Sequence, residues 1–301
     1  MYITTLNIAS LDIELETERL LHLNESFIPF LADKKPGDSA GSRYHAVFRQ
    51  TDRLDIPEAD KRICTRDFDV YEERPGRYIR FYRDGRDGKY YATSRFDRKS
   101  RTVQIRYLAG NEKSVSEAGN SFFHIEWENM LLGEEKMILH AAYVRHPEVG
   151  GVLFSGPSGV GKSTQADLWC TYQGTELLNG DRTILGRGRH GWRAYGSPYA
   201  GSSRCYVNES CNVTALVILK QSPVCRIRRM DKSEAFRAVY AGLTVNNWDS
   251  RFVDRICDLT GELIREVPVY ELSCTPDRHA VELLYSELQK GYEDAEQRPE
   301  D

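Results

Sequence analysis

The chain has 301 residues and a formal net charge of −4, so it lacks the basic balance that is typical of nucleic-acid-binding proteins. Hydrophobic residues make up 40% and charged residues 29%, which is the composition of a globular protein with one large domain or two ordinary ones. No apolar run approaches the roughly 18 residues of a membrane-spanning helix. We therefore expect no nucleic-acid partner and no membrane partner.

The amino terminus and the cysteines indicate a reducing compartment. The first residues have neither a basic start nor a continuous apolar run, so we expect no secretory signal and a cytoplasmic location. Seven cysteines form no C-x-x-C pair, and their odd number is unlike a disulfide framework. Reduced thiols are expected.

The first part of the chain has mostly period-two patterning, which predicts antiparallel strands near residues 2–8, 44–48, 77–82, 89–96 and 102–107. Residues 84–88 suit a hairpin turn. We expect a β-rich N-terminal domain over residues 1–115. Its tyrosines and arginines leave two readings open: a face that binds substrate or partner, or an ordinary half-exposed sheet.

A phosphate-binding loop is the strongest motif. Residues 153–164 read LFSGPSGVGKST, an apolar run, a G-x-x-x-x-G-K-[ST] loop and the start of a helix. In such a loop backbone N–H groups converge on a polyphosphate, the lysine reaches the β- and γ-phosphates, and the serine hydroxyl binds Mg²⁺. We therefore expect ATP or another nucleoside triphosphate, with Mg²⁺, at the residues Gly156, Ser158, Gly159, Val160, Gly161, Lys162, Ser163 and Thr164.

A histidine is predicted to lie at the mouth of this loop. Residues 136–144 read as a strand and residues 145–150 as a turn, so the strand that enters the loop belongs to an antiparallel hairpin. The hairpin places His140 opposite Ser155 or, with a slip of one residue, opposite Gly156. Because an antiparallel entry differs from the usual βαβ entry, we expect a mixed sheet.

An aspartate follows the next strand, at residues 175–178. In a right-handed strand–helix–strand unit the carboxyl end of this strand lies beside the phosphate loop, so Asp181 should face the γ-phosphate and its metal. The Asn-Gly-Asp sequence also suits a plain tight turn, and both readings stay open.

The remaining pattern predicts strands at residues 183–185, 192–195, 213–219, 226–229 and 267–272, and helices at residues 122–135, 232–243, 250–265 and 277–290. Residues 291–301 are rich in Glu, Asp, Gln and Pro, which indicates a disordered tail. The expected fold class is α/β (α+β), with a second domain over residues 116–290.

The second domain resembles the HPr kinase/phosphorylase-related kinases, which share a P-loop core with ATP-dependent phosphoenolpyruvate carboxykinases. The matching text is LHAAYV at 139–144, GVLFSGPSGVGKST at 151–164, LLNGDRTIL at 177–185, YGSPYAG at 195–201, VYEL at 269–272 and Pro276-Asp277. The resemblance implies a mixed-sheet nucleotide-binding kinase core. It also implies that His140 and Asp181 stand around the transferred phosphate.

The chain departs from that family at two places. The family usually has two adjacent aspartates, but here the first is Gly180; either Asp181 alone serves as base and metal ligand, or the site is weakened. The bifunctional enzymes have Ser-Glu where this chain has Ser163-Thr164, and their Gly-rich, Arg-containing signature is absent. HPr is therefore not the expected substrate. Divergent relatives act on a serine of a ribosomally made peptide or on small hydroxylated molecules.

The sequence thus predicts an ATP-dependent kinase with a hydroxyl acceptor, either a serine of a peptide or protein or a small molecule. Lys162, Asp181 and His140 are the expected catalytic residues, Ser163 and Asp181 the metal ligands, and Arg182 or Arg204 the neutralising cation. A nucleotide-binding regulatory protein without transfer remains the alternative. Carboxykinase chemistry is not favoured, because the additional metal ligands and the longer chain are absent. The sequence leaves open whether the protein forms a homo-oligomer.

Overall fold

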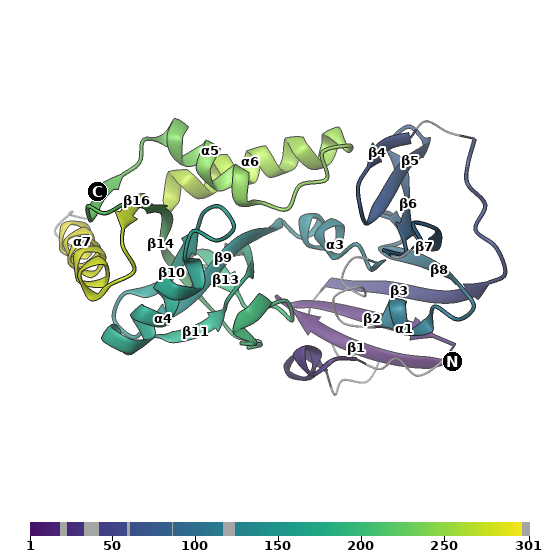
Figure 1. Ribbon diagram of the computed structural model, residues 1–301, viewed down its shortest axis with the longest axis horizontal. Coiled ribbons are helices and arrows are strands. Elements are labelled where there is room, and N and C mark those ends of the chain that lie inside the picture. Colours follow the sequence, from purple (N-terminus) through teal and green to yellow (C-terminus); the bar gives the residue numbers. More distant parts are fainter. Residues whose placement is uncertain (19–22, 33–41, 59–60, 86, 117–123, 297–301) are drawn as a thin grey trace. The chain divides into compact units, whose positions relative to one another are not determined.

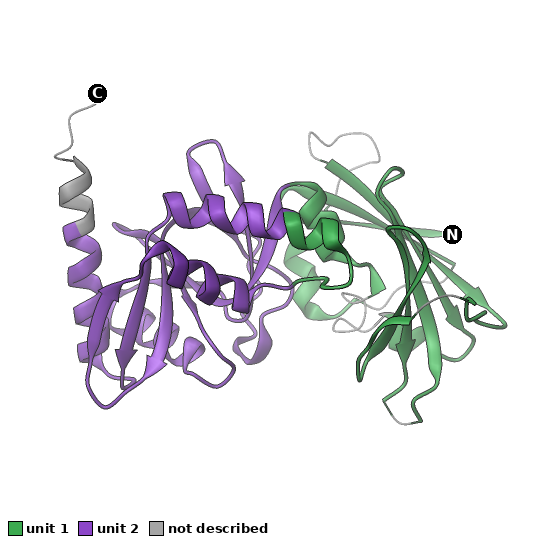
Figure 2. Ribbon diagram, turned by 90° about the horizontal axis from the view of Figure 1, so that it is seen from above, with its two compact units in different colours: residues 1–134, 245–254 green, residues 135–244, 255–301 purple. Residues whose placement is uncertain are grey.

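The computed structural model describes residues 1–18, 23–32, 42–58, 61–85, 87–116 and 124–296, the last six of these as backbone only (Figure 1). The chain divides into two compact units (Figure 2). Unit 1 comprises Met1–Glu134 and Val245–Asp254, and unit 2 comprises Glu135–Thr244 and Arg255–Asp301. Unit 1 thus extends past residue 115, where the sequence indicated a joint, and includes a segment from much later in the chain. In the described residues no helix combines the length and the apolar character that crossing a membrane needs.

Unit 1 is built on an eight-stranded sheet in the order β1-β2-β3-β8-β7-β6-β5-β4. Its elements are β1 (Tyr2–Ile8), β2 (Leu11–Thr17), η1 (Glu25–Phe30), β3 (Ser42–Thr51), β4 (Lys61–Cys64), β5 (Phe68–Arg74), β6 (Arg77–Arg83), β7 (Tyr90–Asp97), β8 (Thr102–Leu108), α1 (Glu112–Ser116) and α3 (Trp127–Gly133). The predicted turn at residues 84–88 joins β6 to β7, where the amide of Asp84 donates to the carbonyl of Lys89.

The expectation of antiparallel strands throughout this unit is wrong at two places. β3 pairs in parallel with both β2 and β8. Period-two alternation reports which side chains face the core, and it is the same for parallel and antiparallel strands, so it does not reveal strand direction. The alternation itself is seen in β8, where Val103, Ile105 and Tyr107 are buried and Gln104 and Arg106 are exposed.

Unit 2 contains a second sheet, in the order β10-β9-β12-β13-β14-β16-β15. Its strands are β9 (Lys136–His146), β10 (Gly150–Ser155), β11 (Glu176–Asn179), β12 (Arg182–Gly188), β13 (Gly191–Tyr195), β14 (Ser210–Gln221), β15 (Arg226–Arg229) and β16 (Val269–Cys274). β10 pairs antiparallel with β9 and parallel with β14, so the expected mixed sheet is confirmed. The expected mixture of α and β structure is confirmed for the chain as well.

Two helices of unit 2 pack on the parallel part of this sheet. α4 (Lys162–Gln173) and α7 (Arg278–Glu296) share one core cluster with β10, β14 and β16, in which Trp169 is fully buried. α5 (Lys232–Gly242) and α6 (Ser250–Glu266) follow the expected ranges closely, and the apolar stripe of α6 is buried. Because β10, β14 and β16 are parallel, their carboxyl ends meet at one edge of the sheet.

The tail differs from its prediction. α7 continues past Lys290 to Glu296, where a disordered segment was expected from residue 291. Gly291 costs a helix about 1 kcal/mol relative to Ala, and the good helix formers Glu293, Ala295 and Glu296 nearby offset that cost. Residues 297–301 lie outside the described residues.

Candidate phosphotransfer site

The phosphate loop leads from a buried strand into a helix, as the motif requires. β10 ends at Ser155, and α4 begins at Lys162. Gly159 and Gly161 have φ angles of 78° and 112°, a backbone region that side chains rarely adopt, which explains glycine at both positions. No side chain caps the first turn of α4. Its amide groups therefore remain directed at the loop, where an anion would accept from them.

Lys162 lies buried beneath the loop. Its side chain is 7% exposed, and Nζ donates to the carbonyls of Gly156 and Pro157 at 3.0 and 3.1 Å. Burial lowers the pKa of the ammonium, because the surroundings solvate the charge poorly. A phosphate oxygen is the acceptor that would best stabilise this charge.

His140 and Asp181 form a pair at the mouth of the loop. The β9–β10 register ends at Ser155 opposite Ala141, so its continuation puts His140 opposite Gly156, the slipped one of the two predicted registers. His140 also pairs with Arg182 across β9 and β12. His140 Nε2 lies 2.9 Å from Asp181 Oδ1. Two side chains that are distant in sequence are thus joined by a hydrogen bond.

Asp181 is held in its charged form. Burial alone raises the pKa of the carboxyl, but the hydrogen bond from His140 and the charges of Arg182, His140 and Lys162 outweigh that effect, and the pKa is lowered overall. Arg182 Nε lies 3.9 Å from Asp181 Oδ2. The carboxylate is therefore an ionised acceptor, and it is the one negatively charged group among these four side chains.

Asn179 and Ser197 fix the turn that carries Asp181, and neither role was predicted from the sequence. The Asn179 side chain is fully buried; its Oδ1 accepts from the Asp181 amide at 2.9 Å, and its Nδ2 donates to the carbonyls of Ser197 and Tyr199. Ser197 Oγ donates to the carbonyl of Arg182. The Asn-Gly-Asp sequence therefore forms a tight turn and also fixes the position of the Asp181 carboxylate. The signal that the sequence offered was the position of Asn179, directly after the predicted strand at residues 175–178.

Gly180 is not a vacant place for a second aspartate. A Cβ atom built there would lie 2.2 Å from Ser203 Oγ and 3.1 Å from the carbonyl oxygen of Ala200. On the other side of the turn, a Cβ on Gly201 would lie 3.0 Å from the Cβ of Asp181. The loop at residues 200–203 thus packs closely on the turn, and it fills the space that a neighbouring side chain would need.

We expect Gly180→Asp to destabilise the protein rather than restore a second carboxylate. Overpacking a tight site costs about 1–3 kcal/mol. Urea unfolding measures the loss, and adding Ser203→Gly should recover part of it, because that change removes the closest atoms. Gly85→Asp is the matched control, since among the described residues beyond its chain neighbours no atom lies within 4 Å of its Cβ position. A Gly180→Asp variant as stable as the wild type would contradict the packing argument.

A pocket of about 540 Å³ opens beside the phosphate loop. It is lined by the loop, by the first turn of α4, by the ends of β14 and β16, including Leu219, and by the segments that follow them, including Pro223 and Pro276. Gln165 also lines it; this side chain is 2% exposed, and its Nε2 has no hydrogen-bond partner among the described residues. A buried donor without an acceptor indicates a place for a polar ligand.

The metal donors of the region are few. Within the ranges that the structure describes, no group of three or more His, Cys, Asp and Glu side chains is arranged to hold a metal ion. Ser163, at the start of α4, and Asp181 are the hydroxyl and carboxylate donors of the predicted site, and Mg²⁺ usually takes only one or two protein ligands beside phosphates and water. This donor set fits a nucleotide-bound Mg²⁺ rather than an independent metal centre. Arg204 is exposed in the loop, whereas Arg182 adjoins the carboxylate.

Comparisons with known proteins find a similarity of structure. No protein-family model matches the chain, and a search of curated proteins finds no match. Among solved structures the chain is similar to the HPr(Ser) kinase/phosphatase from Coxiella burnetii, at 15% sequence identity with a TM-score of 0.32, over 53% of this chain and 96% of that chain. At this identity and TM-score, the match does not by itself assign an activity to the chain.

Proposed function

We propose that the chain is an ATP-dependent kinase that transfers the γ-phosphoryl group to a hydroxyl acceptor, either a serine of a peptide or protein or a small hydroxylated molecule. The observation that carries the proposal is Asp181, an ionised carboxylate held by His140 and close enough to Lys162 for each charge to affect the other. Phosphoryl transfer needs a positioned anion site, charge neutralisation and an acceptor for the hydroxyl proton. These are the groups that surround the loop.

Each side chain has a defined role in this proposal, and Asp181 has two. Lys162 and the amides of the first turn of α4 bind the β- and γ-phosphates, while Ser163 and Asp181 hold Mg²⁺, which neutralises phosphate charge when bound. Asp181 also orients the acceptor hydroxyl and accepts its proton as the new O–P bond forms and the bond from the γ-phosphorus to the β–γ bridging oxygen breaks, which releases ADP. His140 is a positioning residue for Asp181, and Arg182 adds positive charge beside the carboxylate.

The pocket beside the loop suits the nucleoside part of the nucleotide. It adjoins Gly159, Val160 and Gly161, and its volume of about 540 Å³ is large enough to hold a base and a ribose. The unpartnered Gln165 amide offers a donor there. We also propose, from the order of the motifs, that unit 2 is a P-loop core of the HPr kinase type. HPr itself remains an unexpected substrate.

The purified protein with γ-labelled ATP tests the proposal. We expect label on members of a panel of serine peptides and small polyols, together with slow ATP hydrolysis in the absence of any acceptor. Both signals should require Mg²⁺. Neither transfer nor hydrolysis, with ATP binding intact, would instead support the second candidate, a nucleotide-binding protein without transfer. Glycine instead of a second aspartate beside Asp181, with the Gly180 position closed off by Ser203, favours that candidate.

We expect the stability contribution of Asp181 to depend on pH in a defined direction. Because the folded pKa is lowered, the contribution is fully present above the unfolded value of 3.8 and is lost as pH falls through the folded pKa. The difference in unfolding free energy between the wild type and Asp181→Asn should therefore be constant at neutral pH and change only in acid. Urea unfolding at a series of pH values measures it. A difference that changes between pH values of about 6 and 8 would point to another group.

A further inference from the structure

The sheet of unit 1 opens between two of its strands. β6 begins at Arg77 and β7 ends at Asp97, but their pairing begins only at Arg80 opposite Ser94. On their other sides both strands stay paired: Arg77 lies opposite Arg74 of β5, and Asp97 lies opposite Thr102 of β8. Residues 77–79 and 95–97 therefore have no strand partner on the facing side within the described chain. Such edges are sites for pairing with another strand.

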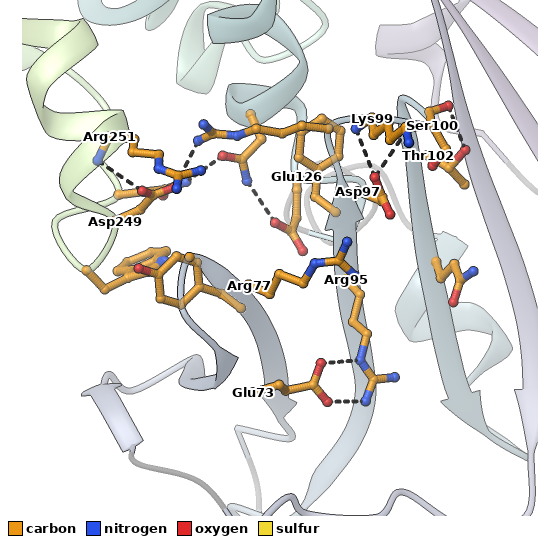
Figure 3. A pocket seen from close by; sticks show the side chains of 18 of the residues that line it. Glu73, Arg77, Arg95, Asp97, Lys99, Ser100, Thr102, Glu126, Asp249 and Arg251 are labelled. Atoms are coloured by element: carbon orange, nitrogen blue, oxygen red, sulfur yellow. Dashed lines mark hydrogen bonds and ion pairs between the residues drawn. The ribbon is translucent and has the colours of Figure 1, made fainter.

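A pocket of about 670 Å³ lies at this opening. It is lined by residues of both strand ends, by α3 and by the segment 246–251, which includes Trp248. Figure 3 shows Arg77 extending into the pocket, with the Arg95–Glu73 pair on one side and Arg251 with Asp249 on the other. All of these residues belong to unit 1.

The acidic side chains of the pocket are already satisfied. Glu73 forms two hydrogen bonds with Arg95, at 2.5 and 2.8 Å, and Asp249 accepts from Arg98 at 2.8 Å. Buried Glu126 lies 3.3 Å from buried Arg80. Asp97 accepts from the backbone amides of residues 99 and 100. These carboxylates therefore offer little to an incoming cation.

Three cations of the pocket lack such partners. In the part of the chain that the structure describes, the side chains of Arg77, Lys99 and Arg251 make no hydrogen bond or ion pair, and all three residues are exposed. The Arg251 guanidinium lies near Gly76, 3.7 Å from the position that a Cβ would take there. The charge that the pocket presents to a ligand is thus positive.

The apolar part of the pocket comes from Tyr78, Phe96 and Trp248. Trp248 is held in place by Arg80, whose guanidinium lies 5.2 Å from the ring centre, and by an edge contact with Phe68. Unpaired strand edges, free guanidinium groups and aromatic surface together suit an extended chain rather than a single ion, because an ion uses only the charges.

We propose that this opening binds an acidic peptide segment in extended conformation, which pairs with the free edge of β6 or β7 and places carboxylate side chains against Arg77, Lys99 and Arg251. This binding goes beyond the proposed kinase activity and does not depend on it. Side chains alternate along a strand, so acidic residues at every second position would face the three cations together.

A fluorescent peptide of alternating Glu and Ser tests the proposal, with a Gln/Ser peptide and a Lys/Ser peptide as controls. We expect the protein to bind the Glu/Ser peptide in the absence of nucleotide, more weakly at high salt, and to bind neither control. Arg77→Ala and Arg251→Ala should each weaken binding about fivefold, as for the loss of one exposed charged contact, and about twentyfold together. Arg106→Ala, an exposed arginine of β8 outside the pocket, should leave it unchanged.

Two further probes separate a peptide from other ligands. A Glu/Ser peptide with N-methylated backbone at alternate positions lacks the amides needed for pairing, so it should bind at least tenfold more weakly. Equal binding of the methylated peptide, or binding of inorganic phosphate or citrate as tight as that of the peptide, would overturn the proposal in favour of a small-anion site. Repeating the titration with Lys162→Met keeps this result separate from the kinase proposal, since the peptide should bind as before.

Discussion

Asp181→Asn is expected to lower phosphoryl transfer about 10³-fold while nucleotide affinity changes about threefold or less. The amide keeps the shape of the side chain and can still contact His140, but it accepts no proton and carries no charge. The carboxylate that the surroundings hold ionised would be lost. Single-turnover transfer from labelled ATP measures the first effect, and titration with a fluorescent ATP analogue measures the second.

The matched control is Asp167→Asn. Asp167 is an exposed residue of α4, and its substitution removes one carboxylate from the same unit without touching the pair. We expect wild-type transfer from it. If Asp181→Asn also transfers at the wild-type rate, Asp181 has no part in the mechanism, and the nucleotide-binding candidate gains no support either.

A magnesium titration distinguishes the two roles of Asp181. If Asp181 mainly holds the ion, Asp181→Asn binds Mg²⁺ more weakly. A high Mg²⁺ concentration should then refill the site by mass action and restore transfer. A carboxylate that accepts the hydroxyl proton is not replaced by added metal. We expect partial recovery only, because Asp181 is proposed to serve both roles.

The local parts of the candidate site could be predicted from the sequence because each has a short-range signal. The loop between β10 and α4 is a contiguous motif, and the hairpin of β9 and β10 places His140 by counting along two strands. The register could be predicted only to within one residue, since the turn at residues 147–149 permits either pairing. The hydrogen bond from Ser155 Oγ to the carbonyl of His140 agrees with the slipped register.

Features that depend on distant segments could not be predicted. Gly180 looked like a missing carboxylate, because nothing local reveals that Ser203 packs against it. The return of the chain into unit 1 at Val245–Asp254 likewise has no periodic signal; it depends on contacts such as the hydrogen bond from Asn246 to Glu128 and the ion pair of Asp249 with Arg98. The parallel pairing of β3 is of the same kind, since alternation does not record direction.

Lys162→Met is expected to weaken nucleotide binding about 100-fold or more, which is a larger loss of affinity than that expected for Asp181→Asn. Methionine keeps the length of the buried stem but removes the ammonium that lies beneath the loop. Calorimetric titration with ATP measures the loss. Lys232→Met, at an exposed position of α5, is the control and should bind ATP as the wild type does.

The same variant should act on Asp181, because the two charges are linked. Lys162 helps to lower the pKa of Asp181, and Asp181 in turn raises the pKa of Lys162 against the effect of burial. Removing the ammonium should therefore shift the Asp181 pKa upward, which NMR titration of the carboxyl carbon measures. An unchanged Asp181 titration together with unchanged ATP affinity would show that the two groups do not share a site. A raised Asp181 pKa together with a lower ATP affinity would show that the Lys162 ammonium acts on both the nucleotide and the carboxylate, so that the phosphate loop and Asp181 belong to one site.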